Sequence, residues 1–305
     1  MSRAPEVSVI VVSYEGRELV RRCLAALAAD APHEATRELI AVDQASSDGT
    51  AGWLEADHPE VRLVALEQNV GFGAGNNRGA ALARGRWLLL LNSDCFVDPG
   101  AIDELVRFGD ASPAIGIVAP RLRWPDGTLQ RSCRRFPSPY RIATEYLYLR
   151  KLAPRSAALN GFYCGDFAHD EPRQVDWLTG ACLLVRRELY ERLGGFDESF
   201  FMYSEEVDLC RRALDLGCET WFDPAAGATH VWGGTAKRDP GPALRENLRS
   251  QLRYLDRHDG RVAAETARGV MLAGLALRAA RSPSHRAAAG WLARRSVGGL
   301  LHGSE

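Results

Sequence analysis

Trp87-Leu88-Leu89-Leu90-Leu91-Asn92-Ser93-Asp94 is the stretch of sequence that decides the fold. Its first five residues form a continuous apolar run, which is typical of a strand buried on both faces of a parallel sheet. The run stops abruptly at three polar residues. In an open α/β sheet, ligands bind just outside the carboxyl ends of the strands, so Asn92, Ser93 and Asp94 are candidates for a binding site. Asn, Ser and Asp are also ordinary turn residues, and this segment alone does not separate the two interpretations.

The chain before this stretch alternates apolar runs with helical patterns. We expect strands over residues 7–12, 38–42 and 61–66 and a helix over residues 17–29. Shorter helices should end near residues 56 and 83. A strand–helix alternation at this spacing predicts an α/β fold in which helices flank a doubly wound, mostly parallel sheet.

The ends of the predicted strands carry polar residues. Ser13 and Glu15 follow the first strand, Asp43 follows the second, and Asp94 follows the apolar run at Trp87. Because the carboxyl ends of parallel strands meet at one edge of the sheet, these residues should converge there. A carboxylate in such a place can bind Mg²⁺ or Mn²⁺, which prefer oxygen ligands and are often shared with substrate phosphates.

A glycine-rich segment over residues 71–79 follows the third predicted strand. It does not match the dinucleotide-binding fingerprint, because Asn76 occupies the place of the third glycine and the fingerprint should follow the first strand. Two interpretations remain. The segment is either a turn at a helix N-terminus that favours an anion, or a tight turn built for close packing.

Composition narrows the class of protein. The chain has 305 residues, is 46% hydrophobic and has a net charge of −1. The near-zero charge gives no electrostatic reason to expect a nucleic-acid partner. Seven scattered cysteines without a Cys-x-x-Cys pair argue against a disulfide framework. The N-terminal apolar run is too short for a signal peptide, and no apolar stretch reaches membrane-spanning length. We therefore expect a cytoplasmic protein.

The second half carries another polar constellation. A strand is expected over residues 175–185, with a break at Thr179 and Gly180. Ser204 is a plausible N-cap for a helix with Glu205 and Glu206 in its first turn, where the helix dipole favours carboxylates. That pattern describes an ordinary capped helix, but the aromatic residues before it favour a carboxylate at a pocket wall. Short strands are expected over residues 218–222 and 228–232. His230 lies in the second, and a lone histidine is more often structural than a ligand.

Taken together, these motifs resemble those of the inverting, GT-A fold glycosyltransferases of family 2, especially the rhamnosyltransferase-like branch. The resemblance spans residues 7–255. The matching segments are residues 42–49, 69–77, 91–94, 179–181 and 195–208, together with His230. This chain departs from the usual pattern at Gln44, which stands in place of asparagine, and at the Glu205-Glu206 pair, which stands in place of Glu-Asp. Both changes are conservative.

The resemblance implies a role for each matching position. Asp43 would bind the uracil or thymine base of a UDP or dTDP sugar, and Asp94 would hold Mg²⁺ or Mn²⁺ on the diphosphate with help from His230. Glu206 would be the general base that deprotonates the acceptor hydroxyl. The remaining expected residues are Ser13, Glu15, Gly71, Asn77, Asn92 and Ser93 on the donor side, Trp177, Thr179 and Gly180 on the acceptor side, and Glu205, Asp208 and Arg211 in support of the base. Asp208 is expected to orient Arg211 or nearby backbone. The leading donor is dTDP-rhamnose, and the acceptor would be a saccharide, a lipid-linked sugar or a small molecule.

The organisation along the chain is expected to change near Pro240. Residues 1–240 would form the catalytic domain, with a nucleotide-sugar half over 1–120 and an acceptor half over 121–240. The loop over residues 230–242 is expected to close over the donor. Residues 241–305 would form an arginine-rich helical extension. Its basic amphipathic helices could contact the inner face of a membrane through residues 261–305, or instead pack on the catalytic domain or form a homo-oligomer interface.

Two other classes of function fit the sequence less well than glycosyl transfer. A sugar nucleotidyltransferase should carry a glycine-rich, basic loop directly after the first strand, and residues 13–16 provide none. A non-catalytic carbohydrate- or nucleotide-binding relative should have lost the acids at Asp94 or Glu206, and both are present.

Overall fold

The computed structural model describes residues 4–30, 34–231, 240–280 and 282–302. Its α-helices are α1 (Arg17–Ala29), α2 (Thr50–Asp57), α3 (Phe72–Ala80), α4 (Ala101–Asp110), α5 (Pro139–Tyr146), α6 (Arg187–Arg192), α7 (Glu205–Asp215), α8 (Pro240–His258), α9 (Arg261–Ala279), α10 (Pro283–Ala293) and α11 (Val297–His302). Its strands are β1 (Val7–Ser13), β2 (Arg37–Asp43), β3 (Val61–Ala65), β4 (Trp87–Asn92), β5 (Cys95–Val97), β6 (Ile115–Arg123), β7 (Leu129–Gln130), β8 (Cys133–Arg134), β9 (Arg173–Val175), β10 (Trp177–Leu178), β11 (Cys182–Arg186) and β12 (Glu219–His230). Two short 3₁₀ helices span Leu149–Lys151 and Gly161–Tyr163.

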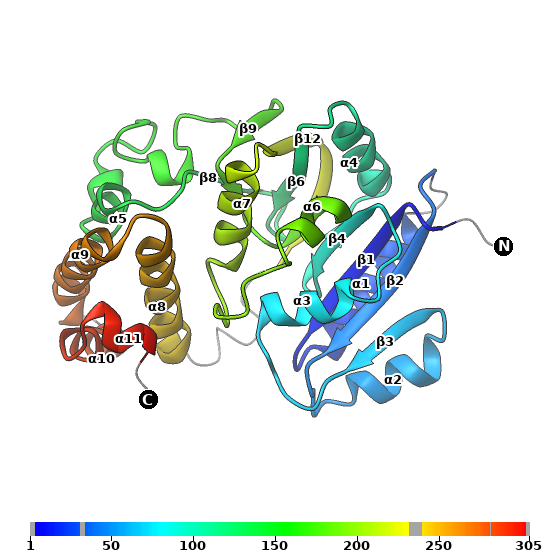
Figure 1. Ribbon diagram of the computed structural model, residues 1–305, viewed down its shortest axis with the longest axis horizontal. Coiled ribbons are helices and arrows are strands. Elements are labelled where there is room, and N and C mark those ends of the chain that lie inside the picture. Colours follow the sequence, from blue (N-terminus) through cyan, green and yellow to red (C-terminus); the bar gives the residue numbers. More distant parts are fainter. Residues whose placement is uncertain (1–3, 31–33, 232–239, 281, 303–305) are drawn as a thin grey trace.

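One large mixed sheet forms the centre of the molecule (Figure 1). Its strand order is β3-β2-β1-β4-β11-β6-β12-β5, with β7 beside β6 and β9 beside β12. The first four strands of this order are parallel, as expected. Strand β11 runs antiparallel to both β4 and β6, whereas β12 is parallel to β6. The expected α/β architecture is confirmed, with its parallel part concentrated in the N-terminal half.

Both faces of this sheet are buried. Alternate residues of β4 enter different cores: Leu88 and Leu90 join the core that includes residues of α7, whereas Leu89 and Leu91 join the core that includes residues of α1 and α4. Successive side chains of a strand point to opposite faces, so a continuous apolar run is what a strand covered on both sides requires.

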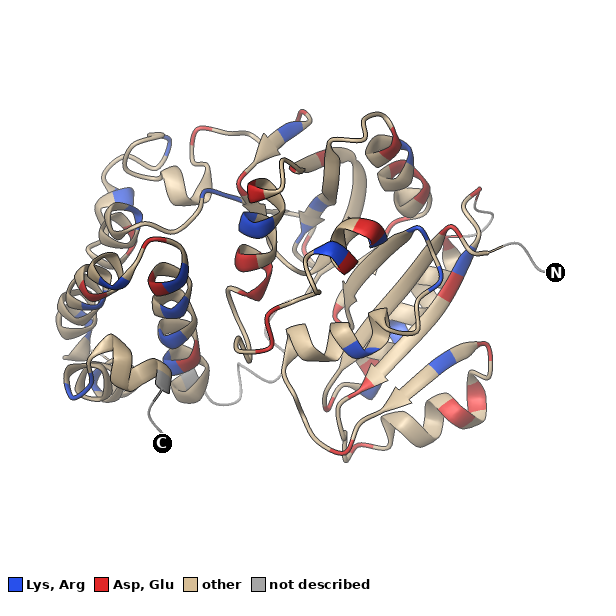
Figure 2. Ribbon diagram, in the orientation of Figure 1, with Lys and Arg blue, Asp and Glu red and all other residues tan. Residues whose placement is uncertain are grey.

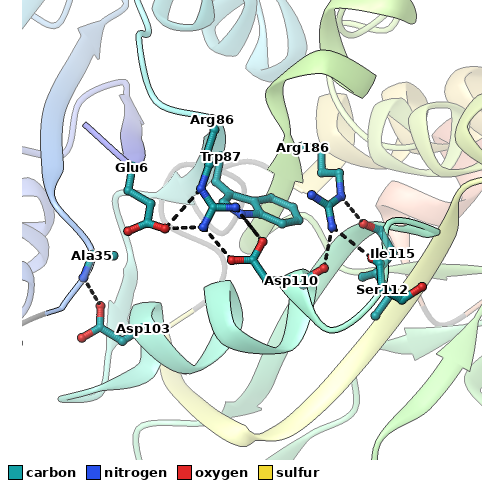
Figure 3. Close-up of polar contacts among 10 residues, drawn as sticks. Glu6, Ala35, Arg86, Trp87, Asp103, Asp110, Ser112, Ile115 and Arg186 are labelled. Atoms are coloured by element: carbon teal, nitrogen blue, oxygen red, sulfur yellow. Dashed lines mark hydrogen bonds and ion pairs between the residues drawn. The ribbon is translucent and has the colours of Figure 1, made fainter. Parts of the chain in front are cut away.

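The end of the sheet away from the strand carboxyl termini is fixed by ionic and aromatic contacts (Figure 3). Arg86 donates two hydrogen bonds of 2.6 Å to Asp110, and the indole N–H of Trp87 donates to the same carboxylate at 3.3 Å. The guanidinium of Arg186 lies 4.4 Å from the Trp87 ring centroid and donates to the carbonyl of Ile115. These contacts join the starts of β4 and β6 to the end of α4.

Two sequence predictions need correction. The single strand expected over residues 175–185 is three strands, because the chain leaves β9, pairs with β8 as β10, and joins the main sheet again only at Cys182. Conversely, the two strands expected over residues 218–222 and 228–232 are one bent strand, β12, and residue 232 lies outside the described residues. The pairing of β12 with β6 shifts register between Asp223 and Gly227, which lets the strand pass Pro224.

The C-terminal helices lie together on the side of the molecule away from β1–β3, beside α5 (Figure 1). They pack on one another and on α5, and their buried apolar residues, such as Leu252 and Met271, belong to the same core as the sheet. The last part of the expected helical extension is divided into the two short helices α10 and α11. Basic residues occur along these helices (Figure 2), and within the described ranges no helix combines the length and apolar character needed to cross a membrane.

Candidate active site

Three neighbouring strands end at one level and bring their terminal polar residues together. Ser13 of β1 pairs in register with Asp43 of β2, and Val12 of β1 pairs with Asn92 of β4. Each strand end carries a buried side-chain oxygen that lacks a hydrogen-bond partner among the described residues: Ser13 Oγ, Asp43 Oδ1 and Asn92 Oδ1. Buried polar atoms are normally satisfied, so three open acceptors at one sheet edge indicate a place for a ligand.

A cavity of about 300 Å³ opens beside these strand ends, and we call it the first cavity. Six of the eight predicted donor-side residues line it: Ser13, Glu15, Gly71, Asn92, Ser93 and Asp94. Asp43 does not line the cavity: 2% of its surface is exposed, and Oδ2 accepts a hydrogen bond from Ser46 N at 3.0 Å. The free Oδ1 is the atom that remains for a ligand N–H.

The loops around the first cavity are held by specific contacts. Glu15 has a φ of 51° and accepts a hydrogen bond from Ser47 N at 2.8 Å, which ties the loop after β1 to the loop after β2. Gly71 has a φ of 90°, and a Cβ there would meet the carbonyl oxygen of Phe201 at 2.2 Å. Only glycine fits this approach, so the glycine-rich segment acts at least in part as a close-packing turn.

Asn77 is not brought to the cavity with the other predicted donor residues. Its amide nitrogen donates to Phe196 O and Glu198 Oε1, and its amide oxygen accepts from Tyr190 Oη at 2.6 Å and from Phe196 N at 2.9 Å. All of its hydrogen-bonding capacity is used to hold α3 against the loop before α7.

Asp94 and His230 meet at the inner wall of the first cavity. Asp94 Oδ1 lies 3.3 Å from His230 Nε2, and the backbone N–H of Val231 donates to Asp94 O. The other ring nitrogen of His230 lies 2.8 Å from Gln130 Oε1, so Gln130 can accept its proton and leave the lone pair of Nε2 toward Asp94. His230 is only 2% exposed.

This pair fits a divalent cation that is completed by a substrate. No group of three or more His, Cys, Asp or Glu side chains suited to a metal occurs among the described residues. A carboxylate oxygen and an imidazole nitrogen suit Mg²⁺ or Mn²⁺ when phosphate oxygens and water fill the other positions.

Glu205 and Glu206 begin α7, and both line the first cavity. Burial raises the pKa of Glu205 well above its ordinary value, and the neighbouring charge of Glu206 raises it further. Burial also raises the pKa of Glu206, while backbone N–H groups of Gly180 and Val207 and the guanidinium of Arg134 oppose that rise. Ser204 precedes them with a φ of 65° and makes no side-chain cap, so the expected N-cap hydrogen bond is absent at this helix start.

A second cavity of about 540 Å³ adjoins the first. Trp177 and Thr179, both expected on the acceptor side, line it, whereas Gly180 lines the first cavity. Four residues line both cavities: Thr179, Tyr203, Glu206 and His230. Glu206 therefore stands at the junction, where a group held in one cavity can meet a group held in the other.

The two remaining predicted residues have structural contacts. Asp208 is fully buried and pairs with Arg212 at 2.7 Å and with His258 at 2.8 Å. The expected pairing of Asp208 with Arg211 is therefore wrong. One helical turn of four residues brings Asp208 and Arg212 to the same face. Arg211 instead points to Asp215 at 3.4 Å and lies over the Phe136 ring.

Sequence reasoning missed a segment that lines the second cavity. Residues 129–134 contribute Leu129, Gln130, Arg131 and Arg134. The polar spacing of Gln130, Arg131 and Arg134 was visible, but nothing in the sequence places β7 and β8 beside a residue one hundred positions later. The loop expected to close over the donor lies largely outside the described residues, since residues 232–239 are not among them.

The sequence of this chain is similar to the sequences of known glycosyltransferases. The family model "Glycosyl transferase family 2" matches residues 8–194, more than half of the chain. An N-acetylglucosaminyl-diphospho-decaprenol L-rhamnosyltransferase of Mycobacterium tuberculosis is 32% identical over 264 residues, which cover 83% of this chain and 85% of that protein.

Solved structures give the fold. A mannosyltransferase of Pyrobaculum calidifontis, in complex with GDP-Man and Mn²⁺, has a TM-score of 0.58 at 18% identity and covers 98% of this chain and 86% of its own. GalNAc-T7, with UDP, GalNAc and Mn²⁺, has a TM-score of 0.62 at 17% identity over 83% of this chain and 48% of its own. The chain therefore belongs to glycosyl transferase family 2, in its rhamnosyltransferase-like branch, and is a glycosyltransferase with the GT-A fold.

Proposed function

We propose that this glycosyltransferase is metal-dependent and inverting, and that it moves a sugar from a UDP or dTDP donor to a hydroxyl of a saccharide, lipid-linked or small-molecule acceptor. Rhamnose from dTDP-rhamnose is the leading donor, because the Mycobacterium tuberculosis relative is named as an L-rhamnosyltransferase. The same name makes N-acetylglucosamine the first acceptor sugar to test.

The observation that carries the proposal is the position of Glu206 between the two cavities. The first cavity and the strand ends beside it offer the open oxygens of Ser13, Asp43 and Asn92 for a nucleoside and the Asp94–His230 pair for a diphosphate. The second cavity offers aromatic and polar side chains for an acceptor. An acceptor hydroxyl at the junction would lie within reach of a single carboxylate.

In this mechanism Asp43 orients the uracil or thymine ring of the donor nucleotide, while Asp94 and His230 would hold the cation. When bound, Mg²⁺ or Mn²⁺ neutralises the charge that develops on the leaving diphosphate. Glu206 removes the proton from the acceptor hydroxyl as that oxygen attacks the anomeric carbon. Displacement in one step from the face opposite the diphosphate inverts the anomeric configuration. Glu205 lines only the first cavity, so Glu206 is the acid of the pair that reaches both cavities.

A thermal-shift panel tests the donor side. UDP, dTDP, GDP and the corresponding sugars are each added with Mn²⁺ or with EDTA, because ligands that bind the folded state raise the melting temperature by mass action. We expect UDP or dTDP compounds to stabilise the protein only with the metal. Stabilisation by GDP compounds alone, or equal shifts in EDTA, would contradict the proposal.

We further propose that the C-terminal helices hold the enzyme near a membrane-bound acceptor, at the inner face of the cell membrane. Residues 241–305 carry eleven arginines and five acidic residues, and a basic surface is attracted to anionic lipids. The packing of α9 on α5 and of α8, α10 and α11 around α9 still leaves apolar side chains accessible to a membrane surface, since Val262 and Leu277 remain 83% and 69% exposed.

A further inference from the structure

Gln130 belongs to the wall of the second cavity, yet it contacts a residue of the expected metal site. Its amide oxygen Oε1 lies 2.8 Å from Nδ1 of His230, which lines both cavities. Both side chains are buried, with 7% and 2% of their surfaces exposed. Gln130 therefore lies behind His230, on the side of the ring away from Asp94.

Two strand pairings explain how residues one hundred positions apart meet. Gln130 of β7 is paired with Leu122 of β6, and Leu122 is paired with Ala228 of β12. His230 lies two residues after Ala228, and residues two apart on a strand point to the same face. Backbone pairing within the sheet thus places the amide of Gln130 against the imidazole.

The orientation of this amide decides which ring nitrogen of His230 carries the proton. A neutral imidazole has one N–H group and one lone pair. With Oε1 toward Nδ1, the proton is on Nδ1 and the lone pair is on Nε2. The opposite orientation would present an amide N–H group to Nδ1, place the proton on Nε2 and direct it at Asp94. Only the first arrangement leaves Asp94 and His230 both able to bind a cation.

The two contacts of the ring differ in length in the way that the first arrangement requires. The distance of 2.8 Å between Gln130 and Nδ1 is that of a hydrogen bond. The distance of 3.3 Å between Nε2 and Asp94 Oδ1 lies beyond the usual range of about 2.7–3.2 Å for an N–H group and an oxygen. The proton of the ring therefore belongs to the contact with Gln130.

A nitrogen ligand affects which divalent cation binds. Mg²⁺ is a hard cation that keeps oxygen ligands and several of its waters, whereas Mn²⁺, a first-row transition metal, gains more from an imidazole nitrogen. On the basis of the proposed metal dependence, we infer that Gln130 is a positioning residue that selects Mn²⁺ over Mg²⁺, because it holds the Nε2 lone pair of His230 toward the cation. Loss of such a supporting contact typically lowers metal affinity by about 10–100-fold.

The tautomer of His230 tests the first step, in the full-length protein without metal or nucleotide. Long-range ¹H–¹⁵N NMR at pH 8, with labelled histidine, reports which ring nitrogen is protonated, and His230→Gln identifies the signal by its absence. We expect the Nδ1–H form in the wild type and in Gln130→Glu, whose carboxylate can also accept the proton. Gln130→Met, which keeps the length of the side chain but removes the acceptor, should lose this preference.

Calorimetry tests the choice of cation. UDP and dTDP are each titrated into the protein in excess Mn²⁺ and, separately, in excess Mg²⁺. The wild type should bind the Mn²⁺ complex more tightly. Gln130→Met should lower that affinity by about 10–100-fold and the affinity for the Mg²⁺ complex much less, whereas Gln130→Glu should keep the preference. Gln174→Met is the matched control, because Gln174 is exposed on β9 and lines neither cavity; it should behave like the wild type.

Three results would overturn the role of Gln130. The first is a wild-type His230 that is protonated at Nε2, and the second is equal affinity of the wild type for the Mn²⁺ and Mg²⁺ complexes; neither needs a variant. The third is an equal loss of both affinities in Gln130→Met, because general damage to the cavity would not distinguish the cations. Failure of the proposed function would be seen separately, as nucleotide binding by the wild type that is the same in EDTA as in either metal.

Discussion

The carboxylate of Asp208 accepts a hydrogen bond from His258, with Oδ1 and Nε2 2.8 Å apart, and so joins the helix that carries Glu206 to the C-terminal helix α8. Arg212 closes the same cluster from α7, and its guanidinium also donates to the carbonyls of Leu193 and Gly195. The first turn of α7 is thus fixed from two sides by a fully buried carboxylate.

Asp208→Ala should therefore destabilise the protein strongly. Breaking a buried ion pair leaves its partners as uncompensated charges and typically costs about 3–5 kcal/mol. Urea unfolding monitored by circular dichroism measures the change in the free energy of unfolding. Asp215→Ala, which removes the exposed partner of Arg211, is the control and should cost about 0–1 kcal/mol. Similar losses in the two variants would show that the cluster is not a structural anchor.

The contacts of this cluster also show which features of the structure cannot be predicted from the sequence. The helix over residues 17–29 and the buried strand at Trp87 were predicted correctly, because periodicity and apolar runs are local signals. The meeting of Ser13, Asp43 and Asp94 followed from a general rule for parallel strands. The contacts of Asp208 with His258 and of Asn77 with Phe196 could not be predicted, because they span 50 and 119 positions and no local pattern encodes them.

Glu205→Gln should stabilise the protein at neutral pH. The raised pKa of Glu205 means that the folded state holds a proton more tightly than the unfolded state does. Between the unfolded and folded pKa values the folded protein binds more protons, so stability falls as pH rises through this window. Gln removes that penalty, and the melting temperature at pH 7.5 should rise by roughly 2 °C for each kcal/mol gained.

The gain in Glu205→Gln should shrink as the pH is lowered toward the ordinary pKa of a glutamate, about 4.3, where both states of the wild type become protonated. Differential scanning calorimetry from pH 4 to pH 8 measures this dependence. A stabilisation that is independent of pH would mean that the ionisation of Glu205 is not its cause.

Asp94→Asn should remove the metal-dependent part of nucleotide binding. The substitution keeps the size of the side chain but removes the only carboxylate in the Asn92-Ser93-Asp94 motif, beside His230. Calorimetry with dTDP and UDP, in Mn²⁺ and in EDTA, should show an affinity lower by about tenfold or more in Mn²⁺, where tenfold corresponds to about 1.4 kcal/mol. Asp126→Asn, in an exposed turn, should bind normally. Binding that is insensitive to both EDTA and Asp94→Asn would exclude this metal site.

Attachment to membranes through the C-terminal helices should be reversible and sensitive to salt. A single membrane-binding feature, such as a basic surface, seldom anchors a protein stably. The attraction of arginine side chains to anionic lipid is also screened at high ionic strength. We expect co-flotation with vesicles that contain anionic lipid at low salt and release at high salt. If the protein does not float with the vesicles at low salt, the arginines of these helices instead contribute to packing within the chain or to an interface between copies of the chain. Light scattering of the free protein would detect the latter.

Glu206→Gln should abolish most turnover while leaving the donor site intact. Glu206 lines both cavities, and its raised pKa places a base of moderate strength where an acceptor hydroxyl would lie. Loss of a general base typically lowers the rate by about 10²–10⁴-fold. Because the base must be ionised, wild-type turnover should fall on the acid side of a pKa above that of an ordinary glutamate.

Calorimetry on Glu206→Gln should show unchanged binding of the nucleotide with Mn²⁺. Glu188→Gln, which changes an exposed acid on α6, should keep wild-type turnover. NMR of the wild-type product should show an inverted anomeric centre, since one carboxylate at the junction supports one displacement. Near-normal turnover in Glu206→Gln, or retention at that carbon, would remove Glu206 from the mechanism.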